Sequence, residues 1–500
     1  MVDADFKLRM RIWRFFSRNY LTKAFTSFTS VQVIGTIISL ILLSLYTRYL
    51  SPDDYGKIAL IMIVVMILSI VVDGGLNTAF SIRFYKLSEK ENKKNIFTIL
   101  IYNFVVVLLV STVFFLYPAI TEKLFMKKIT SNQKLLVCLL IFATILGRFY
   151  TNFLIITKKP RNYFFVNIYF YLTVIAMSFV FLLCLRTGYF AYIYAYLVAH
   201  SMLAISGICH FLFTYRTRLN ELFSLRRLMS LLKLGLPLVP NSLFLMFLTY
   251  ADRYILEMYS GLAAVGVYSV GYVFADKIYA MIINPFGQAL TPVGFQTFTR
   301  SIPEYTALLK KVFEGYCFVM EIFLIVYFAV LREIFEFIVG KQYLEAYNII
   351  GIVIIGTTFF GAASIVGGTI VMKEKTNTVL LFSLISVVFN IFLNFVLIPG
   401  FGIYGAALAT LVSYVIYFYL FFGYTQKLVY VEYDTKLIVL SGLISTVFLV
   451  LIIFISYLDI NVLLRLLIKL VCTCIFILMI QRIFNVKNAL RNVLQYGYLK

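Results

Sequence analysis

Long apolar runs separated by short polar stretches dominate the sequence. Of its 500 residues, 62% are hydrophobic and 13% are charged, whereas a soluble domain has an apolar share of about 45–50%. A helix needs about twenty residues to cross roughly 30 Å of hydrocarbon. The pattern therefore predicts an all-α polytopic membrane protein with fourteen spans, at 27–49, 57–80, 96–118, 134–157, 163–185, 189–214, 231–255, 262–290, 308–330, 343–372, 376–398, 402–425, 437–457 and 462–483.

Basic residues are distributed unevenly between the two sides of the predicted membrane. Thirty Lys and Arg residues fall in the termini and in the loops on their side, and ten fall on the opposite side. Because basic residues concentrate in cytoplasmic loops, both termini are predicted to be cytoplasmic. The net charge of +22 is then explained by loop orientation and anionic lipid, and no nucleic acid partner is expected.

Short phrases recur between the two halves of the chain. YTRYL, from Tyr46, corresponds to YADRYI, from Tyr250, and GYFAYIYAYLVAH, from Gly188, corresponds to GIYGAALATLVSY, from Gly402. Two six-span units inserted in the same direction are expected to enclose a substrate cavity. The predicted division is an amphipathic cytoplasmic N-terminal segment (1–26), an N-lobe (27–214), a cytoplasmic linker (215–230), a C-lobe (231–425), two further helices (437–483) and a cytoplasmic tail (484–500).

Cysteine and histidine form no pattern that is typical of metal binding or catalysis. The six cysteines lie in apolar windows without a CxxC pair, and His200 and His210 each stand alone. We therefore expect no catalytic residue, no metal and no organic cofactor. Every predicted loop is short, which argues against a membrane enzyme such as a glycan polymerase, because such an enzyme needs a long extracytoplasmic loop for its catalytic residues.

The start of span 7 combines residues that interrupt a helix. Gly235, Pro237 and Pro240 break regular backbone hydrogen bonding inside a membrane-length apolar run. Charged residues follow in the same region, and charge at bilayer depth normally faces a watery cavity or a partner. This stretch therefore predicts a hinge beside a transporter cavity.

Several phrases resemble those of the Wzx-type polysaccharide flippases, a branch of the multidrug/oligosaccharidyl-lipid/polysaccharide exporter superfamily, which includes the MATE transporters. The resemblance covers nearly the whole chain and rests on RYLSPDDYGKIAL (48–60), DGGLNTAFSIRFY (73–85), LPLVPNSL (236–243), DRYIL with AVGVYSVGY (252–272) and NIFLNFVLIPGFGIYGAALAT (390–410).

This resemblance implies a function, a location and partners. The function is the transfer of an undecaprenyl-pyrophosphate-linked oligosaccharide from the cytoplasmic to the outer leaflet of the bacterial inner membrane, for O-antigen or a similar surface polysaccharide. Transfer would proceed by alternating access of two lobes, with a polysaccharide polymerase and a chain-length regulator as partners. A lipid II flippase and a MATE-type multidrug or ion antiporter remain alternatives, and a glycan polymerase is a more distant one.

Such a substrate would favour fixed cations in the cavity. Arg148 lies about nine residues from the cytoplasmic end of span 4, roughly 14 Å, which is too deep for easy snorkelling. It is a candidate substrate contact, and the alternative is an ion pair with Asp73. Lys277 is a second candidate, with Asp276 as a pairing partner or proton site.

Three further arginines are candidate contacts with the substrate. Arg48 and Arg253 occupy matched positions at the predicted outer ends of spans 1 and 7, where interfacial anchoring is the alternative. Arg253 is the preferred gate or pyrophosphate contact of the two. Arg83 closes span 2 at the cytoplasmic face, where it could meet the head group or simply follow the positive-inside rule.

Buried acids are candidates for coupling transport to H⁺ or Na⁺. They are Asp73, Asp276 and Glu321. In span 14, Arg465 and Lys469 are expected to snorkel outward or to line a groove for the lipid tail. The glycine pair after Asp73 is interpreted as helix packing. The many tyrosines, such as Tyr192 and Tyr196, are attributed mostly to interface belts and packing.

Overall fold

The computed structural model describes residues 20–125, 130–214, 223–458 and 460–484. Most of the predicted N-terminal segment (1–26), half of the predicted linker (215–230) and nearly all of the predicted tail (484–500) lie outside the described residues. The described part of the chain is helical throughout and contains no strand.

The helices follow one another with short connections. They are α2 (Tyr20–Tyr49), α3 (Pro52–Asp73), α4 (Leu76–Arg83), η1 (Phe84–Lys86), α5 (Glu89–Leu116), α6 (Pro118–Phe125), α7 (Ser131–Ile156), α8 (Pro160–Phe179), η2 (Val180–Cys184), α9 (Phe190–Thr214), α10 (Leu225–Gly235), η4 (Leu236–Leu238), α11 (Val239–Arg300), α12 (Ile302–Ile338), η5 (Lys341–Ala346), α13 (Tyr347–Met372), α14 (Thr376–Leu428), α15 (Thr435–Tyr457) and α16 (Val462–Phe484).

Eleven described helices are long and apolar enough to cross a membrane, and two of these, α11 and α14, are hairpins. In α11 the chain reverses at Gly261, which has φ 80° and ψ 174°. Tyr268 consequently donates a 2.5 Å hydrogen bond to the Asp252 carboxylate, although sixteen residues of straight helix would separate them by about 24 Å. In α14 the reversal is at Gly402, which has φ 51° and ψ −127°.

Counting α11 and α14 as two spans each, and the 37-residue helix α12 as one, gives fourteen spans among the described residues. The prediction of an all-α polytopic membrane protein is therefore confirmed. The division into domains stays a prediction.

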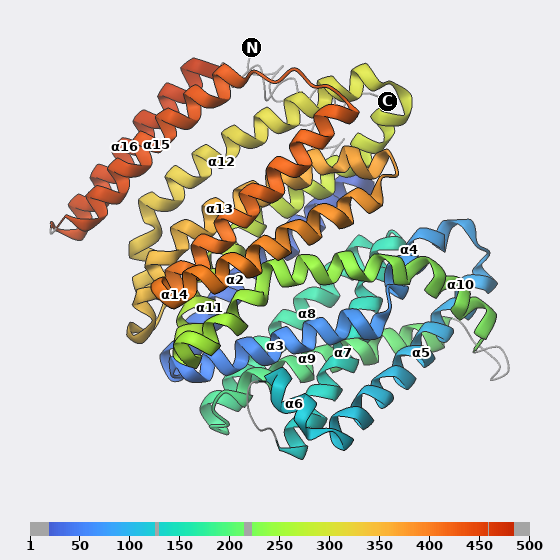
Figure 1. Cartoon of the computed structure of the whole chain (residues 1–500). Coiled ribbons are helices and arrows are strands. Elements are labelled where there is room, and N and C mark those ends of the chain that lie inside the picture. Colours follow the sequence, from blue (N-terminus) through green and yellow to red (C-terminus); the bar gives the residue numbers. More distant parts are fainter. Residues whose placement is uncertain (1–19, 126–129, 215–222, 459, 485–500) are drawn as a thin grey trace, which may run out of the picture.

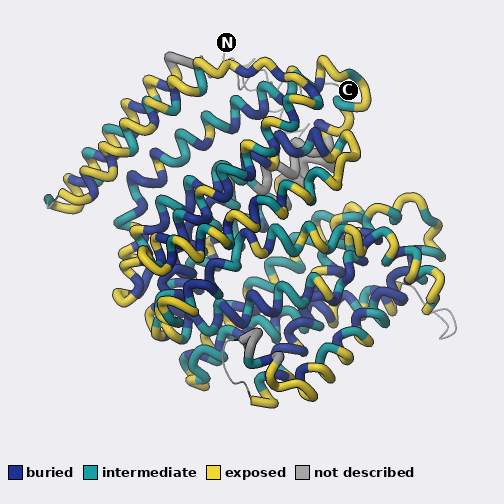
Figure 2. Tube along the Cα trace, in the orientation of Figure 1, coloured by how far each residue is buried: buried dark blue, intermediate teal, exposed yellow. Residues whose placement is uncertain are grey.

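The helices form two layers (Figure 1). In that view α3 to α9 lie below and α12 to α16 lie above, and the layers draw apart toward the side where α4 and α10 lie. The helix α11 packs against α3 from the first layer and against α13 and α14 from the second. Buried residues concentrate where helices of one layer pack together, while much of α15 and α16 is exposed (Figure 2). A bilayer would cover these exposed apolar faces.

Close backbone contact joins the layers beside the turn between α2 and α3. A Cβ atom on Gly266 would lie 1.9 Å from the carbonyl oxygen of Pro52, and one on Gly56 would lie 2.2 Å from that of Leu262. Only glycine fits such an approach. Hydrogen bonds reinforce this contact, because the side chains of Gln342 (2.7 Å) and Tyr343 (3.0 Å) both donate to the carbonyl oxygen of Leu50.

Candidate functional site

A cavity of about 330 Å³ lies where α2, α3, α7 and α9 face α11. The charged side chains in its wall are all basic: Arg148 from α7, and Arg253 and Lys277 from the two arms of α11. The rest of the wall is apolar or carries neutral polar groups, with several tyrosines. Three of the five predicted cationic residues are therefore brought together in one cavity from positions far apart in the sequence.

Two of these cations have no direct partner. Arg148 is exposed to the cavity, and its guanidinium makes no ion pair or hydrogen bond with any residue that the structure describes. Lys277 is half-buried, and its ammonium group is likewise unpaired within the described chain. Asp73 acts on Arg148 electrostatically, but the direct ion pair considered as an alternative is not formed. Both cations remain available to an anion in the cavity.

The third cation, Arg253, is held firmly by its surroundings. Its guanidinium is 2.7 Å from the carboxylate of Asp252, and the side chains are 3% and 1% exposed. The rings of Tyr250, Tyr268 and Tyr272 lie 4.8, 5.0 and 4.2 Å from it, so that aromatic faces enclose the charge. Most of the positive charge of Arg253 is thus neutralised within the protein.

The position of Arg253 also differs from the predicted one. The first arm of α11 continues to the turn at Gly261, so that Arg253 lies eight residues, or about 12 Å, before the end of its helix. The expectation that Arg253 occupies the outer end of span 7 is therefore wrong, because that span is longer than predicted. Its role as a substrate contact stays a prediction.

A smaller cavity of about 120 Å³ adjoins the first one and shares Arg148 with it. Its wall includes Asp73 and the break between α3 and α4, where Gly74 and Gly75 have φ of 57° and 73°. Asp73 accepts a 3.3 Å hydrogen bond from the backbone N–H of Asn77, in the first turn of α4. Span 2 is thus a broken helix whose break faces a cavity that carries both charge signs.

The break in span 2 lies against a second helix break, at the start of span 7. There α10 ends at Gly235, η4 contains Pro237, and α11 begins with Pro240 in its first turn. A Cβ on Gly75 would lie 2.3 Å from the carbonyl oxygen of Gly235, so the two breaks touch backbone to backbone. The predicted interruption of span 7 is present. The one in span 2 was not predicted, although an adjacent glycine pair after an acid inside an apolar run could have indicated it.

The other two predicted arginines lie outside this cavity wall. The guanidinium of Arg48 donates a 2.8 Å hydrogen bond to the carbonyl oxygen of Phe337 at the end of α12. Arg83 donates to the hydroxyl of Ser230 and so fastens α4 to α10. Both contacts join helices, and a role of either arginine in binding the substrate stays a prediction.

The predicted coupling acids occupy three different places. Asp73 lies in the smaller cavity, and Asp276 is half-buried on α11 next to Lys277. Glu321 lies on α12 and accepts a 2.9 Å hydrogen bond from Ser441 of α15, away from both cavities. Within the described residues, no group of three or more His, Cys, Asp or Glu is placed to hold a metal ion.

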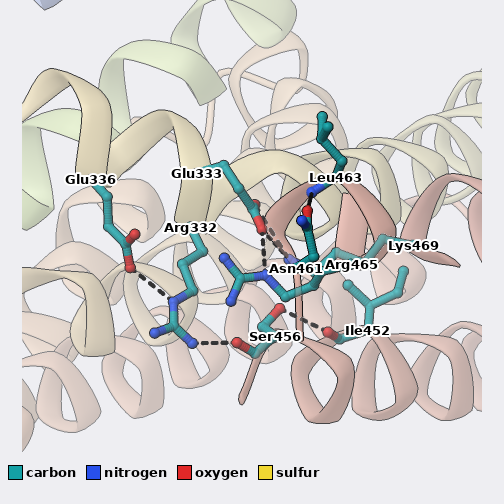
Figure 3. A network of polar contacts seen from close by, with 9 residues as sticks. All are labelled: Arg332, Glu333, Glu336, Ile452, Ser456, Asn461, Leu463, Arg465 and Lys469. Carbon is teal, nitrogen blue, oxygen red and sulfur yellow. Dashed lines mark hydrogen bonds and ion pairs between the residues drawn. The ribbon is translucent and has the colours of Figure 1, made fainter. Parts of the chain in front are cut away.

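The charges of span 14 form a separate network between α12 and α16 (Figure 3). The carboxylate of Glu333 is 3.0 Å from both Arg465 and Lys469, and Lys469 is fully buried. Beside it, Arg332 binds Glu336 at 2.8 Å. The expectation that Arg465 and Lys469 snorkel or line a tail groove is wrong, because a carboxylate on α12 pairs with both.

The fourteen spans counted among the described residues define a polytopic membrane protein, and five of its helices, α2, α3, α7, α9 and α11, line a basic cavity. The chain belongs to the polysaccharide biosynthesis protein family, whose model matches residues 21–298. This confirms the family to which the sequence motifs pointed. No curated protein matches the sequence.

Solved structures share the fold at low sequence identity. The lipid II flippase MurJ, in an inward closed conformation, aligns with a TM-score of 0.72 and 17% identity, over 91% of this chain and 99% of its own. An inward-facing multidrug resistance MATE family transporter of the MOP superfamily gives 0.57 and 14%, over 80% and 98%. A mutant of the Vibrio cholerae MATE transporter VcmN gives 0.53 and 13%, over 82% and 94%. The fold is thus that of MurJ and the MATE transporters.

Proposed function

We propose that the protein is a flippase that moves an undecaprenyl-pyrophosphate-linked oligosaccharide to the outer leaflet of the bacterial inner membrane. The observation that carries this proposal is the pair of unpaired cations, Arg148 and Lys277, in one cavity between α7 and α11. A pyrophosphate needs fixed cations where water is scarce, and Arg binds phosphate oxygens in a bidentate manner. The family and the fold support a lipid-linked substrate.

In this proposal the head group enters from the cytoplasm and is held between Arg148 and Lys277. The contact of Gly266 with Pro52 keeps the outer side closed while the head group enters, and the touching helix breaks at Gly75 and Gly235 then allow the lobes to rock and open that side. Arg253, whose charge is already balanced by its neighbours, contributes the shape of the wall more than a free cation.

The proposal also includes the orientation of the protein in the membrane, its partners and the ion that drives transport. Both termini face the cytoplasm, and a polysaccharide polymerase and a chain-length regulator act on the product outside. Transport is coupled to H⁺ or Na⁺ through a buried acid, for which Asp73 is the preferred candidate because it lies beside Arg148 in the adjoining cavity. Binding of the pyrophosphate to Arg148 would weaken the hold of that cation on Asp73 and so link the two sites.

A lipid II flippase is the second candidate, favoured by the likeness to MurJ. The pyrophosphate-lipid end is common to both substrates, so the basic cavity fits either. A multidrug antiporter fits less well, because a cavity for cationic drugs needs carboxylates, and the charged groups in this wall are basic.

The test is an export assay in a bacterium that lacks its own polysaccharide flippase and carries this gene with the matching glycosyltransferases. Loss of one charge-assisted contact, worth about 1.5–3 kcal/mol, should lower export about 10- to 100-fold for Arg148→Gln and for Lys277→Gln. Lys427→Gln, an exposed residue at the end of α14, is the matched control and should export normally.

Surface polysaccharide at normal levels in both cavity variants would refute the cationic site. Rescue of a strain that lacks its lipid II flippase, without rescue of polysaccharide export, would transfer the proposal to lipid II. All variants are compared at equal membrane abundance, so that loss of protein is not taken for loss of transport.

A further inference from the structure

The end of α2 receives hydrogen-bond donors from a distant part of the chain. The last carbonyl groups of an α-helix have no donor within the helix itself. The helix α2 ends one residue before Leu50, whose carbonyl oxygen accepts bonds from the side chains of Gln342 (2.7 Å) and Tyr343 (3.0 Å). Leu50 is 3% exposed and Tyr343 is fully buried, so this contact is largely shielded from water. Two side chains of η5 therefore cap α2.

Two further hydrogen bonds lie beside this cap. The backbone N–H of Gly340 donates to the hydroxyl of Thr47 at 3.1 Å, and the guanidinium of Arg48 donates to the carbonyl oxygen of Phe337 at 2.8 Å. A Cβ atom on Gly340 would lie 2.1 Å from the carbonyl oxygen of Thr47, so the two backbones touch. The segment 337–343 of the predicted C-lobe thus holds the end of a helix that belongs to the predicted N-lobe.

The internal repeat explains why the end of α2 needs a cap. The phrase YTRYL at the end of α2 corresponds to YADRYI in the first arm of α11. The helix α2 ends one residue after Arg48, whereas the arm of α11 continues for eight residues beyond Arg253, to the turn at Gly261. The carbonyl group that corresponds to that of Leu50 therefore lies inside a helix, where the next turn supplies its donor. The early end of α2 leaves a carbonyl group that the other lobe satisfies.

We propose that Gln342 and Tyr343 form a latch on the outer gate, and that their bonds to Leu50 hold the extracytoplasmic side closed. This inference rests on the alternating access of the proposed function and adds the residues that regulate access to its cavity. When the lobes separate on the outer side, the carbonyl oxygen of Leu50 loses both donors. The donors and the acceptor are uncharged, and each such bond contributes little net stability, which suits a gate that opens in every transport cycle. Gln342 and Tyr343 are therefore positioning residues that set the balance between the closed and the open outer side.

The experiment measures access to the cavity from outside the membrane. Ser39, which lines the cavity, is replaced by Cys in a full-length protein whose six native cysteines are replaced by Ala. A small membrane-impermeant thiol reagent is added to spheroplasts, and the labelling rate of Ser39→Cys reports the population of the outward-open state. Loss of one neutral hydrogen bond should raise this rate about two- to tenfold in Gln342→Leu and in Tyr343→Phe. The two substitutions together should raise it more than either does alone.

Matched variants remove the same groups from bonds that do not join the lobes. Gln426→Leu removes a side chain that donates to the carbonyl oxygen of Val431 at 3.1 Å. Tyr305→Phe removes a hydroxyl that lies 2.7 Å from the hydroxyl oxygen of Thr369. Neither bond reaches the predicted N-lobe, so the labelling rate of Ser39→Cys should equal the wild-type rate in both controls. All variants are compared at equal membrane abundance.

Two results would overturn the inference. If the double latch variant is labelled at the wild-type rate, η5 does not hold the gate. A second reporter, Ser413→Cys, is fully buried in α14 and should stay unlabelled. If it is labelled as fast as Ser39→Cys in the latch variants, the substitutions have loosened the fold, and the latch is refuted. Neither readout needs a lipid substrate, so normal export by Arg148→Gln and Lys277→Gln would refute the cationic site and leave the latch standing.

Discussion

Two groups of basic residues inside the membrane-length helices look alike in sequence and differ in structure. In the cavity, Arg148 and Lys277 have no direct partner among the residues that the structure describes. Between α12 and α16, Arg465 and Lys469 share the carboxylate of Glu333 at 3.0 Å (Figure 3). The difference shows that a cation in an apolar helix indicates a ligand site only when the fold provides no partner for it.

The largest stability effect is expected at the paired region. Glu333→Gln would leave two buried cations without their carboxylate, and breaking a buried pair costs about 3–5 kcal/mol. We expect a marked fall in the midpoint of thermal unfolding in detergent. Glu336→Gln is the control, because its carboxylate is 45% exposed and bonds only Arg332, so that the loss should be about 1 kcal/mol or less.

A similar fall in the unfolding midpoint for both glutamate variants would show that the burial of Lys469 does not affect stability. A repair variant sharpens the test. Combining Glu333→Gln with Lys469→Met removes the fully buried stranded cation and should recover a large part of the lost stability, because apolar replacements of buried ion pairs are well tolerated.

An intermediate loss of stability is expected at Asp252, smaller than at Glu333 and larger than at Arg148. Asp252→Asn removes the carboxylate from one cation, not two, and Arg253 keeps the faces of three tyrosines as well as a hydrogen bond to the carbonyl oxygen of Thr249. The expected loss is about 2–3 kcal/mol. Tyr268→Phe, which removes only the hydroxyl that donates to Asp252, should lose about 1 kcal/mol. Chemical denaturation of the four proteins, including the wild type and Glu333→Gln, gives the ranking; Tyr268→Phe losing more than Asp252→Asn would contradict it.

The overall fold could be predicted because its signal is local. Apolar runs of membrane length require helices, since backbone groups in lipid must be satisfied within their own segment. The interruption at Gly235 and Pro237 was also predicted from a local signal, because proline has no backbone N–H to donate to a helical hydrogen bond. The break at Gly74 and Gly75 was missed because the glycine pair was interpreted as close packing alone, whereas the structure shows both close packing against Gly235 and a positive φ at each glycine.

The sequence could identify candidate cavity residues, but it could not separate the residues that line the cavity from those that bind a structural partner. Arg148, Arg48 and Lys469 all carry the same signal, a basic residue in or at the end of an apolar run. Their partners come from distant helices: Arg48 bonds the carbonyl oxygen of residue 337, and Lys469 bonds residue 333. No periodicity or spacing encodes such contacts, because they depend on how the helices pack. The same holds for Tyr192 and Tyr196, whose position in the cavity wall sets them apart from the other tyrosines.

The smallest stability effect is expected at the unpaired region. Arg148→Gln removes a cation that forms no ion pair within the described chain. The free energy of unfolding should therefore stay within about 1 kcal/mol of the wild type or rise slightly, because an unpaired charge away from bulk water is itself costly. The same variant should bind undecaprenyl pyrophosphate at least about tenfold more weakly. Glu333→Gln should show the opposite pattern, with reduced stability and unchanged affinity at temperatures where it stays folded. Thermal unfolding and lipid binding measured on the same preparations test both halves. If Arg148→Gln unfolds as early as Glu333→Gln, then Arg148 has a structural role like that of Lys469, and the contrast between the two regions does not hold.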